Sequence, residues 1–185
     1  MEIALALVGL FVFAGVVAAL VVKRLLVVCQ PHEILVLVGA KRQVGGHVVG
    51  YRLIRGGRTM RTPFIERVER LDLSEIPVEF RVTRAYSKGN IPLAVDAVAR
   101  VKIDGREPEV DNAIERFLGR PRSAIAEVAR QSLEGQLREA LAQATAEEVE
   151  RGATRFAELL IEESQSDFRR LGLVVETLEI RSVRR

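Results

Sequence analysis

The chain begins with an unbroken apolar run. Residues 3–22 carry no charged side chain, and the cations Lys23 and Arg24 follow them directly. At about 1.5 Å rise per residue, a helix of this length covers roughly 30 Å, which matches the hydrocarbon thickness of a bilayer. The run therefore predicts a transmembrane helix, whose membrane anchor residues include Ile3, Leu10, Phe11, Phe13, Leu20 and Val22.

The position of the two cations distinguishes a retained anchor from a cleaved signal peptide. A signal peptide carries its basic residues before the apolar core, yet here only Met1 and Glu2 precede it. Positive charges that follow an apolar run favour a cytoplasmic location for what comes next. We therefore expect a single-pass protein of the cell membrane with its main domain in the cytoplasm. Residues 1–28 are predicted to form the anchor with its juxtamembrane segment, and residues 29–185 the domain.

Short strands are expected directly after the anchor. The apolar character continues to Val28, and Pro31 is expected to end the helix. The β-branched and leucine-rich run 34–38 predicts a first strand. The glycine pairs at 45–46 and 56–57 predict turns, since neither has the strand-to-helix context and spacing of a phosphate-binding loop.

The clearest strand pattern covers residues 76–103. Val78, Phe80 and Val82 alternate with polar residues, and a second alternating run extends from Leu93 to Ile103. The segment 87–90 has turn composition. This pattern predicts a long antiparallel hairpin with one face on a core. It places Asp96 on the opposite face, as a surface or pairing residue.

Apolar residues with a helical period follow Gly105. They predict a short helix from about 107 to 118, a second helix over 122–143, and a third that begins at a capping box, Thr145 to Glu148, and ends at Gly172. Residues 173–180 then predict a closing strand. The expected fold class is α+β: an N-terminal transmembrane helix, then one domain with an antiparallel sheet, three helices and a closing C-terminal strand.

The distribution of charged residues indicates which kind of partner the chain binds. The chain carries a net charge of +3, but residues 41–70 hold eight Lys and Arg against two Glu. Such a basic stretch close to an anchor suggests that Arg52, Arg55 and Arg58 contact anionic lipid headgroups. The alternative is that these arginines pair with acidic residues elsewhere. Nucleic acid is not expected as a partner, since the chain has no Trp and few aromatic residues for stacking.

Candidate chemistry is sparse. One cysteine and two histidines, without zinc-site spacing, predict neither a metal site nor a disulfide, and no cofactor site is expected. Both histidines lie in the first 50 residues, which offers no basis for a catalytic triad, so we do not expect an enzyme. Cys29, beside the predicted anchor, is a possible S-acylation site; the alternative is a small apolar side chain at an interface.

Several motifs in order along the chain resemble one family. They are Arg55-Gly-Gly-Arg58 leading to Pro63-Phe64, Ile91–Asp96 entering a strand that ends at Val101–Ile103, Phe117-Leu-Gly119, Leu133–Arg138, Thr145–Val149, Phe156, and Leu171–Leu173 with Leu178–Ile180. On these motifs the chain resembles the SPFH or band-7 proteins (stomatin, prohibitin, flotillin and the HflK/C group), and most closely the flotillin branch.

The resemblance implies a non-enzymatic membrane scaffold that forms homo-oligomers and organises membrane microdomains. Its implied partners are membrane lipids, further copies of itself and an NfeD-type membrane protein. The HflK/C and prohibitin branches imply an alternative, a regulator that binds and fences a membrane protease. Those branches commonly place the domain on the other side of the membrane, so Lys23 and Arg24 favour the scaffold. Flotillin-like chains usually continue into a long coiled coil, whereas this sequence ends at Arg185, which leaves its self-assembly in question.

Overall fold

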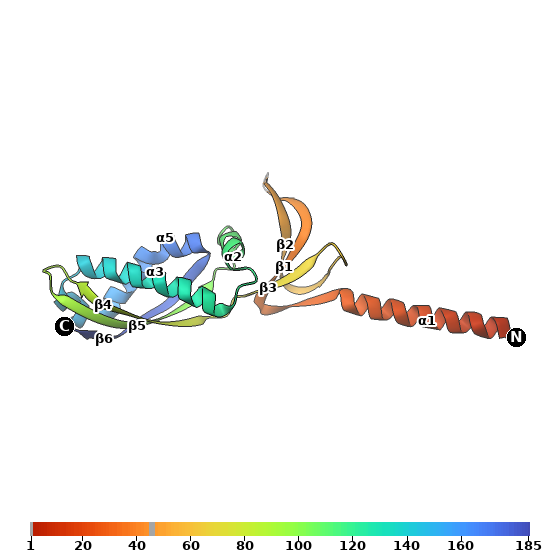
Figure 1. Cartoon of the computed structure of the whole chain (residues 1–185), viewed down its shortest axis with the longest axis horizontal. Coiled ribbons are helices and arrows are strands. Elements are labelled where there is room, and N and C mark those ends of the chain that lie inside the picture. The colour runs from red at the N-terminus through yellow and green to blue at the C-terminus, as the bar shows by residue number, and fades with distance from the viewer. Residues whose placement is uncertain (1, 45–46) are drawn as a thin grey trace. The chain divides into compact units, whose positions relative to one another are not determined.

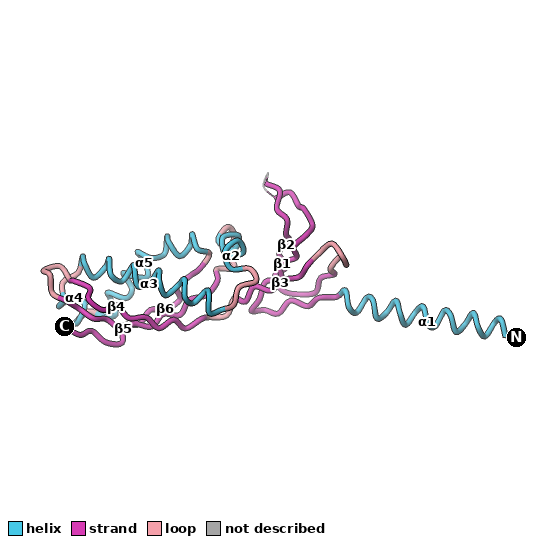
Figure 2. Tube along the Cα trace, viewed as in Figure 1, coloured by secondary structure: helices cyan, strands magenta, loops and turns pink. Residues whose placement is uncertain are grey.

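The computed structural model describes the backbone of residues 2–44 and 47–185, and the side chains of residues 9–39 and 50–185. Two compact units form along the chain, Met1–Leu71 (unit 1) and Asp72–Arg185 (unit 2), and each is described by itself. Unit 1 contains α1 (Glu2–Leu25), β1 (Leu26–Val44), β2 (His47–Met60) and most of β3 (Arg67–Asp72) (Figure 1). Of the helices in the described part of the chain, only α1 lies in unit 1 (Figure 2).

Helix α1 covers the whole of the apolar run, so the prediction of a helix is confirmed. The prediction of a transmembrane span is not: among the residues that the structure describes, no helix is both long and apolar enough to cross a bilayer. The predicted boundary between residues 28 and 29 stays a prediction.

The junction after α1 differs from the prediction that helix continues to Val28. The helix ends at Leu25, and β1 starts at the next residue. Leu26 pairs with Met60 in β2, and the Arg61 N–H donates to the Leu25 carbonyl oxygen at 3.1 Å. Strand pairing with a distant segment therefore sets the end of the helix, and the β-branched Val27 and Val28 favour the strand.

The sheet of unit 1 has the strand order β2-β1-β3, and β1 and β2 form a long antiparallel hairpin. The predicted turn at residues 45–46 lies outside the described residues. The predicted turn at Gly56 and Gly57 is wrong, because both lie within β2. They face a register shift in β1 between Cys29 and Ile34, and their φ angles of +74° and +83° favour glycine. These glycines thus form an irregular part of a strand.

Unit 1 has a small apolar core. Cys29, Leu35 and Leu37 are buried on β1 and pack with the partly buried Ile54 and Val68. The predicted strand 34–38 is confirmed as the central part of β1.

Unit 2 contains a second antiparallel sheet with the order β4-β5-β6: β4 is Ile76–Tyr86, β5 is Pro92–Ile103 and β6 is Leu173–Arg184. The predicted hairpin is confirmed, with Val78 opposite Ala99 and Val82 opposite Val95. The inward residues of β4 alternate with exposed ones, as an antiparallel sheet with one covered face requires. The closing strand is confirmed as well, and it pairs with β5.

Helices cover one face of this sheet, with α3 against β4 and α5 against β6 (Figure 1). The helices of unit 2 are α2 (Glu109–Phe117), α3 (Arg122–Gln143), α4 (Ala146–Arg151) and α5 (Ala153–Leu171). The first two match the prediction. The third predicted helix is two helices, since the backbone leaves helical geometry at Gly152. The capping box of Thr145 and Glu148 and the left-handed stop at Gly172 are both confirmed.

Candidate functional site

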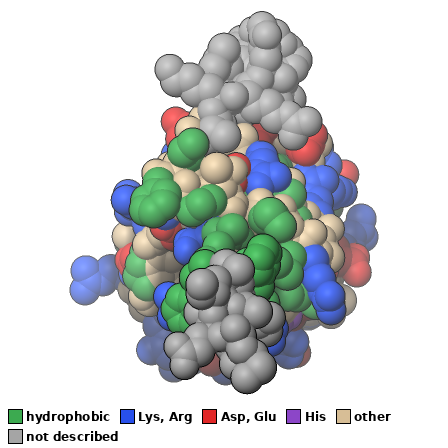
Figure 3. Space-filling model, turned by 90° about the vertical axis from the view of Figure 1, so that its right-hand side faces the viewer, with side chains coloured by type: hydrophobic (Ala, Val, Ile, Leu, Met, Phe, Trp, Pro, Cys, Tyr) green, Lys and Arg blue, Asp and Glu red, His purple; other side chains and the backbone are tan. Residues whose placement is uncertain are grey.

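The described side chains of α1 before Lys23 form an apolar surface. Its large described side chains are exposed over 42% to 78% of their area: Leu10, Phe11, Val12, Phe13, Val16, Val17, Leu20, Val21 and Val22. Ile3, also predicted to anchor, lies outside the described side chains. Figure 3 shows described hydrophobic side chains gathered on the face turned to the viewer. An exposed apolar surface of this size indicates contact with a membrane or another protein.

Lys23 and Arg24 lie in the last turn of α1, where both are exposed. Cations at this end of a helix interact favourably with its dipole. The abrupt change from apolar to basic surface therefore coincides with the end of the helix.

A second exposed apolar feature is the turn between β2 and β3, residues 62–66, here called the Phe64 loop. Phe64 is fully exposed and Ile65 is 62% exposed. Phe64 has a φ of +67°, a conformation that residues other than glycine seldom adopt. The Glu66 N–H closes the loop by donating to the Thr62 carbonyl oxygen at 3.0 Å.

An ion pair between Arg52 and Glu66 stabilises this loop. The Nε of Arg52 donates to Oε1 of Glu66 at 3.0 Å, and its Nη2 donates to Oε2 at 3.2 Å. The same Nη2 donates to the Met60 carbonyl oxygen at 2.8 Å. The Glu66 side chain is 4% exposed and that of Arg52 29%. The backbone N–H of Thr62, which donates to Glu66, and then Arg52 lower the pKa of Glu66 against the opposing effect of burial.

The arginines of the basic stretch, residues 41–70, therefore differ in their contacts. Arg52 is occupied by Glu66, which matches the alternative that arginines here pair with acidic residues, whereas Arg55 and Arg58 are exposed on β2. Arg70 pairs with the buried Glu33. Headgroup contact by Arg52, Arg55 and Arg58 stays a prediction.

Cys29 lies inside unit 1, with 5% of its area exposed. Its thiol donates to the carbonyl oxygens of Glu33 at 3.2 Å and Ile54 at 3.3 Å, and accepts from the N–H of Gly56 at 3.2 Å. Acylation of Cys29 stays a prediction, but in this conformation the thiol is not accessible to an acyl donor.

The uncovered face of the unit 2 sheet carries ion pairs. Asp96 accepts from Arg81 across the β4–β5 pair, from Ser182 Oγ at 2.8 Å and from Arg184 at 2.6 Å. Arg81, then Ser182 and Arg184, lower the pKa of Asp96. The prediction that Asp96 is a pairing residue is confirmed.

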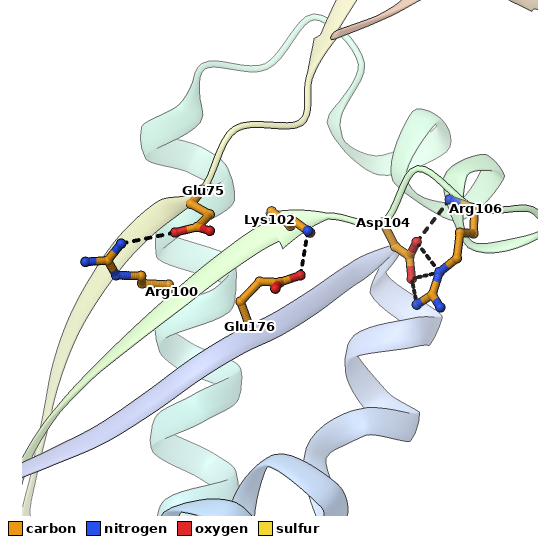
Figure 4. A network of polar contacts seen from close by, with 6 residues as sticks. All are labelled: Glu75, Arg100, Lys102, Asp104, Arg106 and Glu176. Atoms are coloured by element: carbon orange, nitrogen blue, oxygen red, sulfur yellow. Dashed lines mark hydrogen bonds and ion pairs between the residues drawn. The ribbon is translucent and has the colours of Figure 1, made fainter. Parts of the chain in front are cut away.

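The ion pairs continue along β5 (Figure 4). Arg100 pairs with Glu75 at 3.3 Å, and Lys102 with Glu176 at 2.6 Å. Beyond the end of the strand, Asp104 accepts from the guanidinium of Arg106. Opposite charges thus neutralise one another along this face, which is suited to water or a polar partner.

Unit 2 also has an open groove of about 540 Å³ among α3, α4 and α5. Its apolar lining includes Phe156, Leu159 and Leu160, and Glu148 and Arg155 lie among its polar residues. Among the described residues no group of metal-binding side chains occurs, in this groove or elsewhere.

Sequence reasoning missed the two buried carboxylates of unit 1, Glu33 and Glu66. A signal was present for Glu66, since it is one of only two acids in a strongly basic stretch and so has an excess of possible partners. Which arginine it pairs with depends on how β2 and the Phe64 loop fold together.

Comparison with known proteins identifies one family and relatives within it. The profile of the SPFH domain / Band 7 family matches residues 27–184. Human Flotillin-1 is 28% identical over 156 residues, which cover 84% of this chain and 35% of that protein. The Flotillin-like protein FloT of Bacillus subtilis (strain 168) is 30% identical over 133 residues, 72% of this chain and 26% of FloT. This chain thus spans about a third or less of each relative's length.

The family match extends from the first residues of β1 to the end of β6, and so includes both sheets and all the helices after α1. The motifs that carried the resemblance lie within it. The chain belongs to the SPFH domain / Band 7 family, in its flotillin branch.

Proposed function

We propose that this protein is a membrane-attached, non-enzymatic scaffold of flotillin type. The apolar surface of α1 inserts into a bilayer, and Lys23 and Arg24 hold the following domain at the cytoplasmic face. The observation that carries the proposal is the exposed, uncharged side-chain surface from Leu10 to Val22, joined without a linker to the SPFH domain. Burying that surface in lipid removes its large unfavourable contact with water.

The domain supports a scaffolding function through its surface chemistry. The ion pairs of the unit 2 sheet, centred on Asp96, leave that face neutralised and hydrated. The groove in unit 2 is lined by both apolar and charged side chains, a mixture that suits contact with another protein. The resemblance to flotillins adds homo-oligomerisation, the organisation of microdomains and an NfeD-type companion to the proposal.

Membrane fractionation of the full chain tests the attachment. We expect wild-type protein to sediment with membranes after alkaline carbonate washing. Replacing Phe13 and Val17 together by Arg should release it, because two charges in the inserted surface are costly. Leu159→Arg, at an exposed apolar position in unit 2, is the matched control and should stay with the membrane. A freely soluble wild type, or a double variant that stays bound, contradicts the proposal.

A reporter fused after Arg185 tests the side of the membrane. Activity confined to the cytoplasm is expected. Activity only in the exterior compartment contradicts the cytoplasmic placement and favours the protease-regulator alternative.

Light scattering in detergent tests self-assembly. The chain has a mass of 20.5 kDa, so an oligomer is readily distinguished from a monomer after correction for bound detergent. A monomer at all protein concentrations contradicts self-assembly of this chain, while leaving membrane attachment intact.

A further inference from the structure

We propose that the Phe64 loop is a second, rigid membrane contact, which inserts Phe64 and Ile65 into the interfacial layer of the bilayer that α1 enters. The inference rests on the proposed attachment of α1 and adds a specific site to it.

The loop begins where α1 ends. The Arg61 N–H donates to the carbonyl oxygen of Leu25, the last helical residue, and Met60 pairs with Leu26. When α1 is inserted, Lys23 and Arg24 in its last turn lie at headgroup level. The backbone that enters the loop is therefore fixed at nearly the same depth as the membrane surface.

The side chains near this junction suit an interface. Phe64 and Ile65 are joined by three further apolar side chains with exposed fractions of 43% to 54%, Leu26, Val28 and Met60. Arg58 and Arg61 are exposed in the same segment. Apolar side chains bordered by cations match the acyl chains and anionic headgroups of a lipid leaflet.

The loop is held in place, so the exposure of Phe64 is imposed by the fold. Glu66 accepts hydrogen bonds from the Thr62 N–H at 2.7 Å and from the Nε of Arg52 at 3.0 Å. These bonds fix both ends of the loop to the sheet. Phe64 keeps its positive φ, and its side chain is fully exposed.

A second copy of the chain is a poorer occupant of this surface. A symmetric contact through the Phe64 loop would bring the cations Lys23, Arg24, Arg58 and Arg61 of one copy towards those of the other. Like charges in an interface are unfavourable, whereas anionic lipid attracts every one of them.

The chain contains no tryptophan, so a single Trp reports on one position. Full-length Phe64→Trp protein is reconstituted into vesicles of phosphatidylcholine and phosphatidylglycerol, with or without bromine on the acyl chains. We expect the Trp emission to be shifted to the blue in vesicles. Brominated lipid should quench most of this emission. Phe13→Trp in α1 serves as the positive control, and Leu159→Trp in unit 2, also partly exposed, should keep its emission.

The outcomes separate the two proposals. Quenching at position 13 but not at position 64 overturns the loop contact and leaves the attachment of α1 standing. Absence of quenching at both positions overturns the attachment as well. A blue shift at position 64 that depends on protein concentration and resists brominated lipid indicates a second copy instead, and also overturns the inference.

The role of the Arg52–Glu66 pair is tested in the same background. Adding Glu66→Gln to Phe64→Trp should weaken the quenching at position 64 several-fold, while Phe13→Trp with Glu66→Gln keeps its quenching. Circular dichroism confirms that the variant is folded. Unchanged quenching at position 64 shows that the loop does not need this pair to reach lipid, and overturns the positioning role.

Discussion

Gly39 lies directly against the backbone of Ile65: a Cβ atom at Gly39 would be 2.1 Å from the Ile65 carbonyl oxygen. The close approach joins β1 to the Phe64 loop. Gly39 also has a φ of +132°, which disfavours any residue with a side chain. Both the backbone conformation and the close contact with Ile65 therefore disfavour a larger residue at this position.

Replacing Gly39 by Ala is expected to destabilise the protein by about 2–4 kcal/mol, because it adds a clash to backbone strain. Urea unfolding in detergent measures the loss. Gly89→Ala is the matched control, since Gly89 has a φ of +116° but no atom near a new Cβ. If both variants lose the same stability, the contact with Ile65 contributes nothing.

Replacing Glu66 by Gln is expected to lower the free energy of unfolding by about 1–3 kcal/mol. The change leaves the partly buried Arg52 without its counter-charge. Glu79→Gln removes one partner of an exposed ion pair with Arg181, and should cost less than about 1 kcal/mol. Equal losses in the two variants would contradict the importance of burial at Glu66.

Acid should destabilise unit 1 through its two buried carboxylates. The pKa values of Glu33 and Glu66 both lie below their usual 4.5 in the folded protein. For Glu33, burial acts to raise the pKa, but the Gln30 N–H and Arg70 outweigh it. A lowered folded-state pKa means that the stabilisation is complete above the unfolded-state value and is lost as the pH falls through the folded-state value.

We therefore expect the free energy of unfolding to decrease below about pH 4.5. The Glu66→Gln variant should show a shallower decrease, since it has lost one of the two groups. Urea unfolding at a series of pH values checks this, and an identical slope in wild type and variant contradicts it.

The thiol of Cys29 should react slowly while the protein is folded. Reaching it requires unit 1 to open, and an opening cost of about 3 kcal/mol slows labelling by a maleimide about 100-fold relative to the protein in urea. Cys29 is the only cysteine, so mass spectrometry gives its labelling directly. Rapid labelling of the folded protein would contradict the burial of Cys29 and would show that its thiol is accessible to an acyl donor.

The sequence by itself determined the elements whose signals are local. The uncharged run of α1, the period-two alternation of β4 and β5 and the capping box at Thr145 each specify their element within a few residues. The boundaries of α3 were predicted in full for the same reason: a proline precedes it, and the next capping box follows it. These features depend on dihedral preferences and on the burial of one face.

The tertiary structure decided what depends on distant partners. Leu26–Val28 became strand because β2 lies beside them, and Gly56 and Gly57 became an irregular strand because they lie opposite the register shift in β1. Cys29, on β1 itself, became buried in the small core of unit 1. The pairing of Arg52 with Glu66 required β2 and the Phe64 loop to fold together. Such contacts join residues far apart in the chain, and no local pattern of side chains encodes which of several arginines meets a given carboxylate.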